Sequence, residues 1–234
     1  MKILAIDTSS KNCSIALLED TNLIAQKHID DEKTHSQKLM PLIDEVLKKC
    51  KLTLNDLDLL SCSIGPGSFT GVRIGVSTVK AFADVTNIPI SPVSSLEGLA
   101  YNVLNSHYTT TNIVCSLIDA KNDNVYCGIF KRENDNFLSL EDFYAANINE
   151  VLENLSKYSF ITFVGDGSNN YKYTILEKYP KSIFIEDDLN IQNSISIGKC
   201  AFYKYKNGIY GDSNYIVPLY LRKSQAERAL EGEK

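Results

Sequence analysis

The chain has 234 residues, of which 44% are hydrophobic and 23% charged, and its formal net charge is −5. This composition predicts one large or two ordinary globular domains, and no apolar run reaches the length of a membrane-spanning helix. The negative charge argues against a protein that binds nucleic acid strongly by itself, since phosphate contacts need clustered Lys and Arg. The sequence reaches Asp7 too early for a secretory signal, so we expect a cytoplasmic protein that binds no membrane.

Cysteine and histidine are scattered along the chain. The six cysteines and three histidines include no pair with the short spacing of a zinc knuckle, a redox motif or HExxH. We therefore predict inert, buried thiols and no metal site. His35 stands beside Ser36, but adjacent helical residues point apart, so this pair is interpreted as the start of a helix.

Three apolar segments, 2–7, 13–19 and 23–29, are joined by short polar turns and predict an antiparallel meander. Asp7, Thr8 and Ser9 crowd the first turn. An acid with two hydroxyls at a strand end could hold a hydrated magnesium ion or a phosphate. These residue types also favour turns by bonding the local backbone, and composition alone favours that second interpretation.

The next elements are two helices around a buried strand. Thr34-His35-Ser36-Gln37 has the spacing of a capping box, and an apolar stripe then follows at helical spacing to Cys50, so Pro41 should kink this helix or move its start towards residue 40. Segment 57–64 predicts a strand, Gly65-Pro66-Gly67 a tight turn, and Ser68 the cap of a helix over 69–85. Neither a Walker A loop nor the dinucleotide-binding pattern is present.

A stripe of glycines runs along the helix over 69–85, because Gly67, Gly71 and Gly75 recur every fourth residue. Each helical Gly costs about 1 kcal/mol relative to Ala, so close approach by another backbone should offset that loss. The stripe can pack inside its own domain or against a partner, and the sequence leaves both possibilities open.

The remaining elements suggest a second half that begins like the first. A strand over 88–94 and a helix over 95–104 precede a polar stretch, where we place the boundary between halves 1–104 and 105–222, followed by a charged tail at 223–234. Strands 113–118 and 125–131 form a predicted hairpin, with Asp119 ending its first strand. Further expected elements are a helix over 149–158, a strand over 160–164 entering Gly165-Asp166-Gly167, a helix over 194–206 and a short segment over 215–222.

Several motifs in this order and spacing resemble the TsaB (YeaZ) family of tRNA threonylcarbamoyladenosine biosynthesis proteins, over essentially the whole chain. They are Ile3-Leu4-Ala5-Ile6-Asp7-Thr8-Ser9, His35-Ser36 with Leu39 and Pro41, Gly65-Pro66-Gly67-Ser68-Phe69-Thr70-Gly71 with Arg73 and Gly75, Asp119-Ala120 with Val125-Tyr126, and Tyr220-Leu221-Arg222. The resemblance implies the α/β, actin-like ATPase fold, which is ribonuclease H-like and has two related α/β halves facing a cleft.

The resemblance further implies a partnership. A TsaB-like protein is a non-catalytic subunit beside its paralogue TsaD, which adds threonylcarbamoyl to N6 of the adenosine 3′ of the anticodon in tRNAs that read ANN codons, and beside the small ATPase TsaE. We accordingly expect no cofactor of its own, ATP or ADP only at the partner interface, tRNA only within the complex, and a homodimer when alone. The expected partner-binding residues are Gly67, Ser68, Phe69, Thr70, Gly71, Arg73, Gly75, Leu39 and Leu42.

An autonomous actin-fold kinase or ATPase is the alternative. It would use Asp7, Thr8 and Ser9 with Asp119 around magnesium and phosphate, and Gly165, Asp166 and Gly167 near adenosine. Kinases of this fold usually place Gly after the first acid, whereas this chain has Thr8-Ser9-Ser10. It also departs from its relatives at Asp123-Asn124, where they carry Gly-Glu, and in its short tail. A metallopeptidase, as older names of the relatives suggest, would lack metal ligands.

Overall fold

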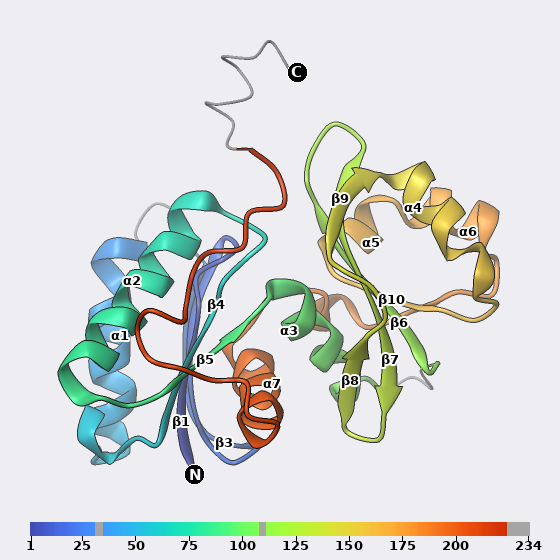
Figure 1. The fold of residues 1–234 in the computed structure, drawn as a ribbon. Helices are drawn as coiled ribbons and strands as arrows, with labels where there is room; N and C mark the ends of the chain where they lie inside the picture. The colour runs from blue at the N-terminus through green and yellow to red at the C-terminus, as the bar shows by residue number, and fades with distance from the viewer. Residues whose placement is uncertain (31–34, 108–110, 224–234) are drawn as a thin grey trace.

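The computed structural model describes residues 1–30, 35–107 and 111–223 and consists there of two α/β halves, each built on one sheet (Figure 1). The first sheet has the order β3 (Asn22–Asp30), β2 (Asn12–Glu19), β1 (Lys2–Asp7), β4 (Leu59–Ser63) and β5 (Ile90–Val93). The first three strands are antiparallel, which confirms the predicted meander, and β4 and β5 continue the sheet in parallel with β1.

Successive side chains of β1 point to opposite faces of the first sheet, so the first half has two apolar layers. Leu4 and Ile6 face α1 (His35–Lys49) and α2 (Phe69–Thr86), whereas Ile3 and Ala5 face α7 (Ser194–Lys206). This is the period-2 geometry of a strand buried on both faces. In Figure 1, α1 and α2 cover the outer face of the first sheet, and α7 and α3 (Ser95–Asn102) lie between the sheets.

The two long helices of the first half begin close to where the sequence predicts. Ser68 caps α2 by accepting a hydrogen bond at Oγ from the Gly71 N–H, at 3.2 Å. Helix α1 contains Pro41 and begins at His35, so the expected shift of its start towards residue 40 is wrong. Its expected capping residue, Thr34, lies outside the described residues.

The second sheet follows the same plan as the first, with a central antiparallel hairpin and parallel strands on one side. Its order is β11 (Ile183–Phe184), β10 (Thr162–Val164), β6 (Ile113–Asp119), β7 (Asn124–Glu133) and β8 (Asn136–Ser139), and β9 (Tyr144–Asn147) also pairs with β7. Antiparallel β6 and β7 form the predicted second hairpin. The helices of this half are α4 (Ile148–Asn154), α5 (Asp166–Asn170) and α6 (Lys172–Lys178). Along the described chain, short 3-10 helices lie at Leu54–Asp56, Val103–Asn105, Leu155–Lys157 and Asp187–Leu189.

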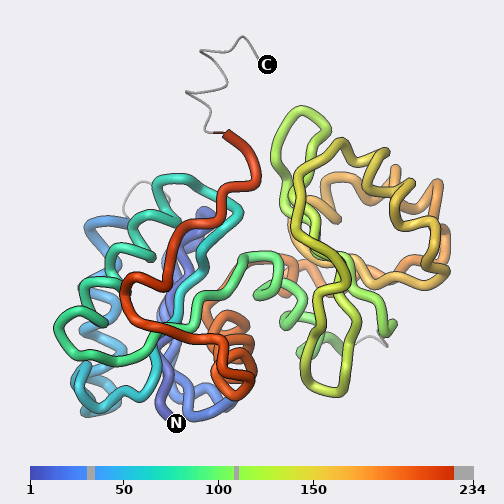
Figure 2. The backbone as a smooth tube through the Cα atoms, viewed as in Figure 1, coloured from blue at the N-terminus to red at the C-terminus, as the bar shows by residue number. Residues whose placement is uncertain are grey.

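The predicted division at residues 104 and 105 needs one correction at the C-terminal side. Helix α7 packs on the strands of the first sheet, because Ile197, Cys200 and Ala201 complete an apolar cluster with Ile3 and Ala16. The chain then stays on the first half, where Gly211 pairs with β5 and the Leu219 N–H donates to the Ile64 carbonyl at 2.7 Å. Residues 194–219 therefore belong to the first half in space, and only the intervening segment forms the second (Figure 2).

No apolar run in the sequence is long enough for a membrane-spanning helix, and the helices of the structure agree with this. Among the residues that the structure describes, no helix combines the length and the apolar character that crossing a lipid bilayer requires.

Candidate functional site

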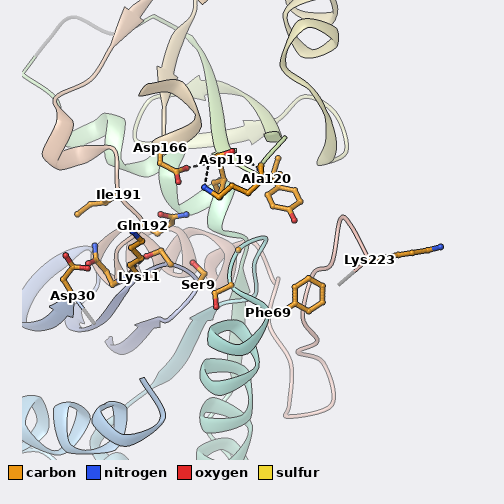
Figure 3. A pocket seen from close by; sticks show the side chains of 17 residues that line it. Ser9, Lys11, Asp30, Phe69, Asp119, Ala120, Asp166, Ile191, Gln192 and Lys223 are labelled. Atoms are coloured by element: carbon orange, nitrogen blue, oxygen red, sulfur yellow. Dashed lines mark hydrogen bonds and ion pairs between the residues drawn. The ribbon is translucent and has the colours of Figure 1, made fainter. Parts of the chain in front are cut away.

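A cleft of about 700 Å³ lies between the two halves, where β1 and β6 end in their hairpin turns. Figure 3 shows polar side chains from both halves around it, including Lys11, Asp119 and Gln192. The lining residues are Ser9, Ser10, Lys11, Asn12, Asp30, Gly67, Ser68, Phe69, Ile118, Asp119, Ala120, Lys121, Tyr126, Asp166, Ile191, Gln192 and Lys223. The cleft thus brings together both predicted acid-ended hairpins and the turn before α2.

The turn after β1 is closed by its own side chains. Asp7 is 1% exposed, and its Oδ1 accepts hydrogen bonds from the Ser9 N–H at 2.9 Å and the Ser9 hydroxyl at 2.7 Å. The Thr8 hydroxyl donates to the Gly71 carbonyl at 2.7 Å, and the Ser9 carbonyl accepts from the Ser68 N–H at 2.7 Å. The acid and both hydroxyls therefore bond the protein itself, as the turn interpretation predicted.

Burial makes Asp7 a weak acid. It raises the pKa of this carboxyl to about 6, against the opposing effects of the Ser9 hydrogen bonds and of nearby His35. Its second oxygen, Oδ2, is buried without a hydrogen-bond partner among the described residues. His35, at the start of α1, is also buried. Its Nε2 lies 3.0 Å from the Lys11 carbonyl, so the histidine contacts the turn between β1 and β2. His35 is also the first residue of α1, as the sequence predicted, whereas its contact with Lys11 was not predicted.

The turn after β6 holds its acid by a salt bridge. The Asp119 carboxylate lies 2.8 Å from the Lys121 ammonium and also accepts from the Lys121 N–H at 2.8 Å and the Asn170 amide at 3.1 Å. Burial by itself would raise the pKa of Asp119, but the Lys121 hydrogen bonds and charge outweigh it, and the pKa is lowered. Asp119 is therefore an ionised group whose charge is already neutralised by its neighbour.

Gly165, Asp166 and Gly167 form the start of α5 and pack against β6. A side chain at Gly165, whose φ is +102°, would place Cβ 2.2 Å from the Leu117 carbonyl oxygen, so both conformation and space require glycine there. Asp166 Oδ1 accepts from the Asp119 N–H at 3.1 Å and the Gly167 N–H at 2.8 Å. These contacts fasten the segment to the second hairpin, and Asp166 is the one of the three that lines the cleft.

The glycine stripe of α2 faces the first hairpin turn. A Cβ at Gly71 would lie 1.9 Å from the Thr8 carbonyl oxygen, one at Gly75 2.6 Å from Thr8 Oγ1, and one at Gly67 2.2 Å from the Ser9 carbonyl oxygen. The backbone that approaches this stripe is thus the chain's own. Of the two possibilities that the sequence left open, the structure favours packing inside the domain.

The other expected partner-binding residues divide into two groups. Leu39 and Leu42 are 1% and 9% exposed in the core, which corrects the expectation that their side chains form a docking surface. Thr70 and Arg73 are exposed on α2, and Phe69 is half-buried at the cleft. This second group can meet another protein without rearrangement, as can Ser68, which is half-buried and lines the cleft.

The structure also adds residues that the sequence did not select for the site. Ile191 and Gln192 line the cleft from the segment before α7, and Phe69 stacks on Tyr220 with ring centroids 4.5 Å apart. Tyr220 belongs to the motif Tyr220-Leu221-Arg222, which was recognised in the sequence, although the residue on which Tyr220 packs was not.

The cysteines and the possible metal ligands can be compared with the prediction in the same way. Five of the six cysteines are buried and Cys50 is half-buried, as predicted for inert thiols. In the described part of the chain, no three His, Cys, Asp or Glu side chains are grouped so that they could hold a metal ion. That the purified protein carries no metal stays a prediction.

Comparisons with known proteins agree with this architecture. A family model described as "TsaD: tRNA N6-adenosine threonylcarbamoyltransferase" matches residues 24–230. The tRNA threonylcarbamoyladenosine biosynthesis protein TsaB of Bacillus subtilis is 34% identical over 236 residues, covering 100% of both chains. Among solved structures, YeaZ from Pseudomonas aeruginosa superposes with a TM-score of 0.77 at 23% identity and covers 94% of this chain and 99% of its own.

The wider fold is shared with sugar kinases. The ROK hexokinase from Thermus thermophilus has a TM-score of 0.52 at 9% identity and covers 89% of this chain and 100% of its own, which bears on the fold alone. The two related halves around a cleft are thus the actin-like ATPase fold that the motifs implied. With full-length similarity to a curated relative and the same fold as YeaZ, the chain belongs to the TsaB (YeaZ) family.

Proposed function

We propose that this protein is the non-catalytic partner subunit of the TsaD-containing assembly that makes threonylcarbamoyladenosine in tRNA. The observation that carries the proposal is the similarity to a curated TsaB protein along the entire chain. In the proposed assembly, the TsaD-like paralogue transfers the threonylcarbamoyl group, and a TsaE-like ATPase joins the complex. The tRNA binds only to the complete complex, which works in the cytoplasm. Any ATP or ADP sits at the partner interface.

The acids at the ends of β1 and β6 support an accessory role, because each of them already bonds a neighbouring residue. Asp7 bonds Ser9, and Asp119 pairs with Lys121, so neither is presented as an open carboxylate for a hydrated cation. Glycines that could bring backbone amides to a phosphate are absent from the turn Thr8-Ser9-Ser10. These contacts support the proposal that the two acids stabilise their hairpin turns and take no part in catalysis.

The solvent side of α2 is the surface that we propose for the paralogue. Thr70, Ser77 and Ala81 are exposed there at helical spacing, and Val85 is 82% exposed. On α1, Met40 is 50% exposed. Short side chains along an exposed helix allow another helix to approach closely, and the flanking Val and Met supply apolar contact area. Without the paralogue, the same face would form the homodimer, since an isologous pair uses one patch twice.

The test places a long charged side chain on this face. Ala81→Arg should weaken co-purification with the TsaD-like paralogue at least about tenfold, because an unpaired charge would be buried at the contact. The matched control is Tyr173→Arg, which puts the same side chain on α6 in the second half, where Tyr173 is 87% exposed. Binding by Ala81→Arg at wild-type strength would refute this surface, provided that both variants melt like the wild type.

The kinase or ATPase remains the second candidate because the fold is shared with sugar kinases. Because the acids of both hairpin turns bond neighbouring residues, calorimetry should find only weak ATP binding by the isolated chain and negligible turnover. Micromolar affinity, together with hydrolysis that Asp7→Asn abolishes, would establish the enzyme instead.

A further inference from the structure

Three consecutive residues near the C-terminus, Tyr220, Leu221 and Arg222, contact three different parts of the molecule. They follow the segment that returns over the first half, and Figure 2 shows this segment in red as it runs from the first half towards the space between the halves. The proposed function assigns no role to this motif, and its contacts go beyond that function.

Tyr220 fastens the segment to the first turn of α2. Its ring stacks on Phe69 with an interplanar angle of 4°, and its hydroxyl accepts a hydrogen bond from Arg73 Nε at 2.7 Å. The Arg73 guanidinium carbon lies 5.6 Å from the centre of the Tyr220 ring, within the range of a cation–π contact. One residue earlier, the Leu219 N–H donates to the Ile64 carbonyl. The motif is therefore anchored in the first half through both side chains and backbone.

Leu221 and Arg222 fasten the same segment to the second half. Leu221 packs against the apolar cluster that α3 forms with β6, β7 and β10, which includes Leu99 and Ile118. Arg222 Nη1 donates to the Ala120 carbonyl in the hairpin turn after β6, at 2.7 Å. Phe69 and Ala120 both line the cleft, from opposite halves. The motif therefore connects the two sides of the cleft at one end; Figure 3 labels Phe69 and Ala120, the cleft residues that it contacts.

We propose that Tyr220-Leu221-Arg222 is a clasp that holds the two halves at a fixed relative position and thereby sets the width of the cleft. Among the described residues, α3 and α7 also pack between the two sheets. A relative rotation about these helices would change the distance between Phe69 and Ala120, which the clasp joins. Its bond to a backbone carbonyl makes this restraint depend on the Arg222 side chain and not on the residue at 120.

The decisive variant is Arg222→Ala. A hydrogen bond from a charged donor stabilises the closed arrangement of the two halves. Its removal should raise the fraction of molecules in which the halves have rotated apart on the order of tenfold. Hydrogen exchange would detect this at the hairpin turn, where the amides of Ala120 and Asn124 are held by bonds across the turn. We expect their exchange to accelerate about tenfold, and Arg222→Lys, which retains a cationic donor, to recover part of the protection.

Arg132→Ala is the matched control. Its Nε also donates to a backbone carbonyl, that of Asn134 at 3.0 Å, but within one loop of the second half. It should leave exchange at the 120–124 turn unchanged. A second measurement uses spin labels at Ala81→Cys and Tyr173→Cys, one on each half, in a Cys50→Ser background. Arg222→Ala should broaden the distribution of distances between these labels.

Two results would overturn the clasp. One is unchanged exchange and an unchanged distance distribution in Arg222→Ala, and the other is an equal effect of Arg132→Ala. If Arg222→Ala does not fold, Tyr220→Phe tests the first-half anchor by removing only the hydroxyl that Arg73 contacts. That variant should broaden the distances without lowering the melting temperature of the halves, and a narrow, wild-type distribution would likewise refute the proposal.

Discussion

The contact between the glycine stripe of α2 and the first hairpin turn can be tested by Gly71→Ala. An added Cβ would lie 1.9 Å from the Thr8 carbonyl oxygen and 3.1 Å from its carbonyl carbon. Because those atoms are backbone, the strand end or the helix must move. The same movement would lengthen the 2.7 Å hydrogen bond from the Thr8 hydroxyl to the Gly71 carbonyl.

The expected magnitude follows from three contributions. Overpacking costs about 1–3 kcal/mol, and losing the hydrogen bond costs about 1 kcal/mol. Ala recovers about 1 kcal/mol of helix propensity relative to Gly. The net loss is therefore about 1–3 kcal/mol, and a loss of about 2 kcal/mol lowers Tm by about 4–8 °C in a chain of this size.

The assay is thermal unfolding by circular dichroism, with two companion variants on the same helix. In Gly75→Ala the new Cβ would meet the Thr8 side chain at 2.6 Å and not backbone, so the loss should be smaller. Ser77→Ala is exposed and should be neutral or slightly stabilising, through helix propensity alone. A Gly71→Ala chain that is as stable as Ser77→Ala would refute internal packing of the stripe and return it to the partner interpretation.

Three further outcomes are expected. The pKa of Asp7 is about 6 in the folded chain and 3.8 in an ordinary Asp, so stability should fall by about 3 kcal/mol as pH rises through this window. The sign follows because the folded state binds the extra proton there; denaturation curves that do not converge with those of Asp7→Asn towards pH 4 would contradict it. Leu39→Ala should cost about 2–5 kcal/mol, since Leu39 is 1% exposed, and a neutral effect would show that α1 is not core. Elemental analysis after dialysis should find no zinc or iron, and one ion per chain that is lost in His35→Ala would overturn this.

Local signals along the sequence were sufficient for most elements. The helix over 194–206 was predicted to the residue, and the structure shows that the Asn193 side chain caps it by accepting from the Ser196 N–H. The central strand, turn and helix were also recognisable, since Gly65 and Ser68 specify the turn and the cap. Strands as short as Ile183–Phe184 carry too few residues for a period, and they form because β10 offers an open edge.

What the sequence could not provide is contact between distant segments. The glycine stripe indicates that a backbone comes close, yet only the fold shows that Thr8, 63 residues from Gly71, is that backbone. The contact of Asn170 with Asp119 and the burial of Leu39 depend likewise on how distant segments are placed. Of the residues that the sequence suggested for a nucleotide or phosphate, Ser9 and Asp166 line the cleft, whereas Asp7, Thr8, Gly165 and Gly167 do not.

The return of α7 to the first sheet has a consequence for synthesis of the chain. The Ser194 N–H donates to the Ser14 hydroxyl across 180 residues, and Ile197 covers the face of β1 that carries Ile3. While the ribosome makes the second half, α7 does not yet cover that face of the first sheet, and apolar side chains of the face remain exposed. At about 5–20 residues per second this interval lasts several seconds, during which chaperones would bind this surface. A fragment that ends before residue 194 should therefore aggregate, even though it contains all five strands of the first sheet.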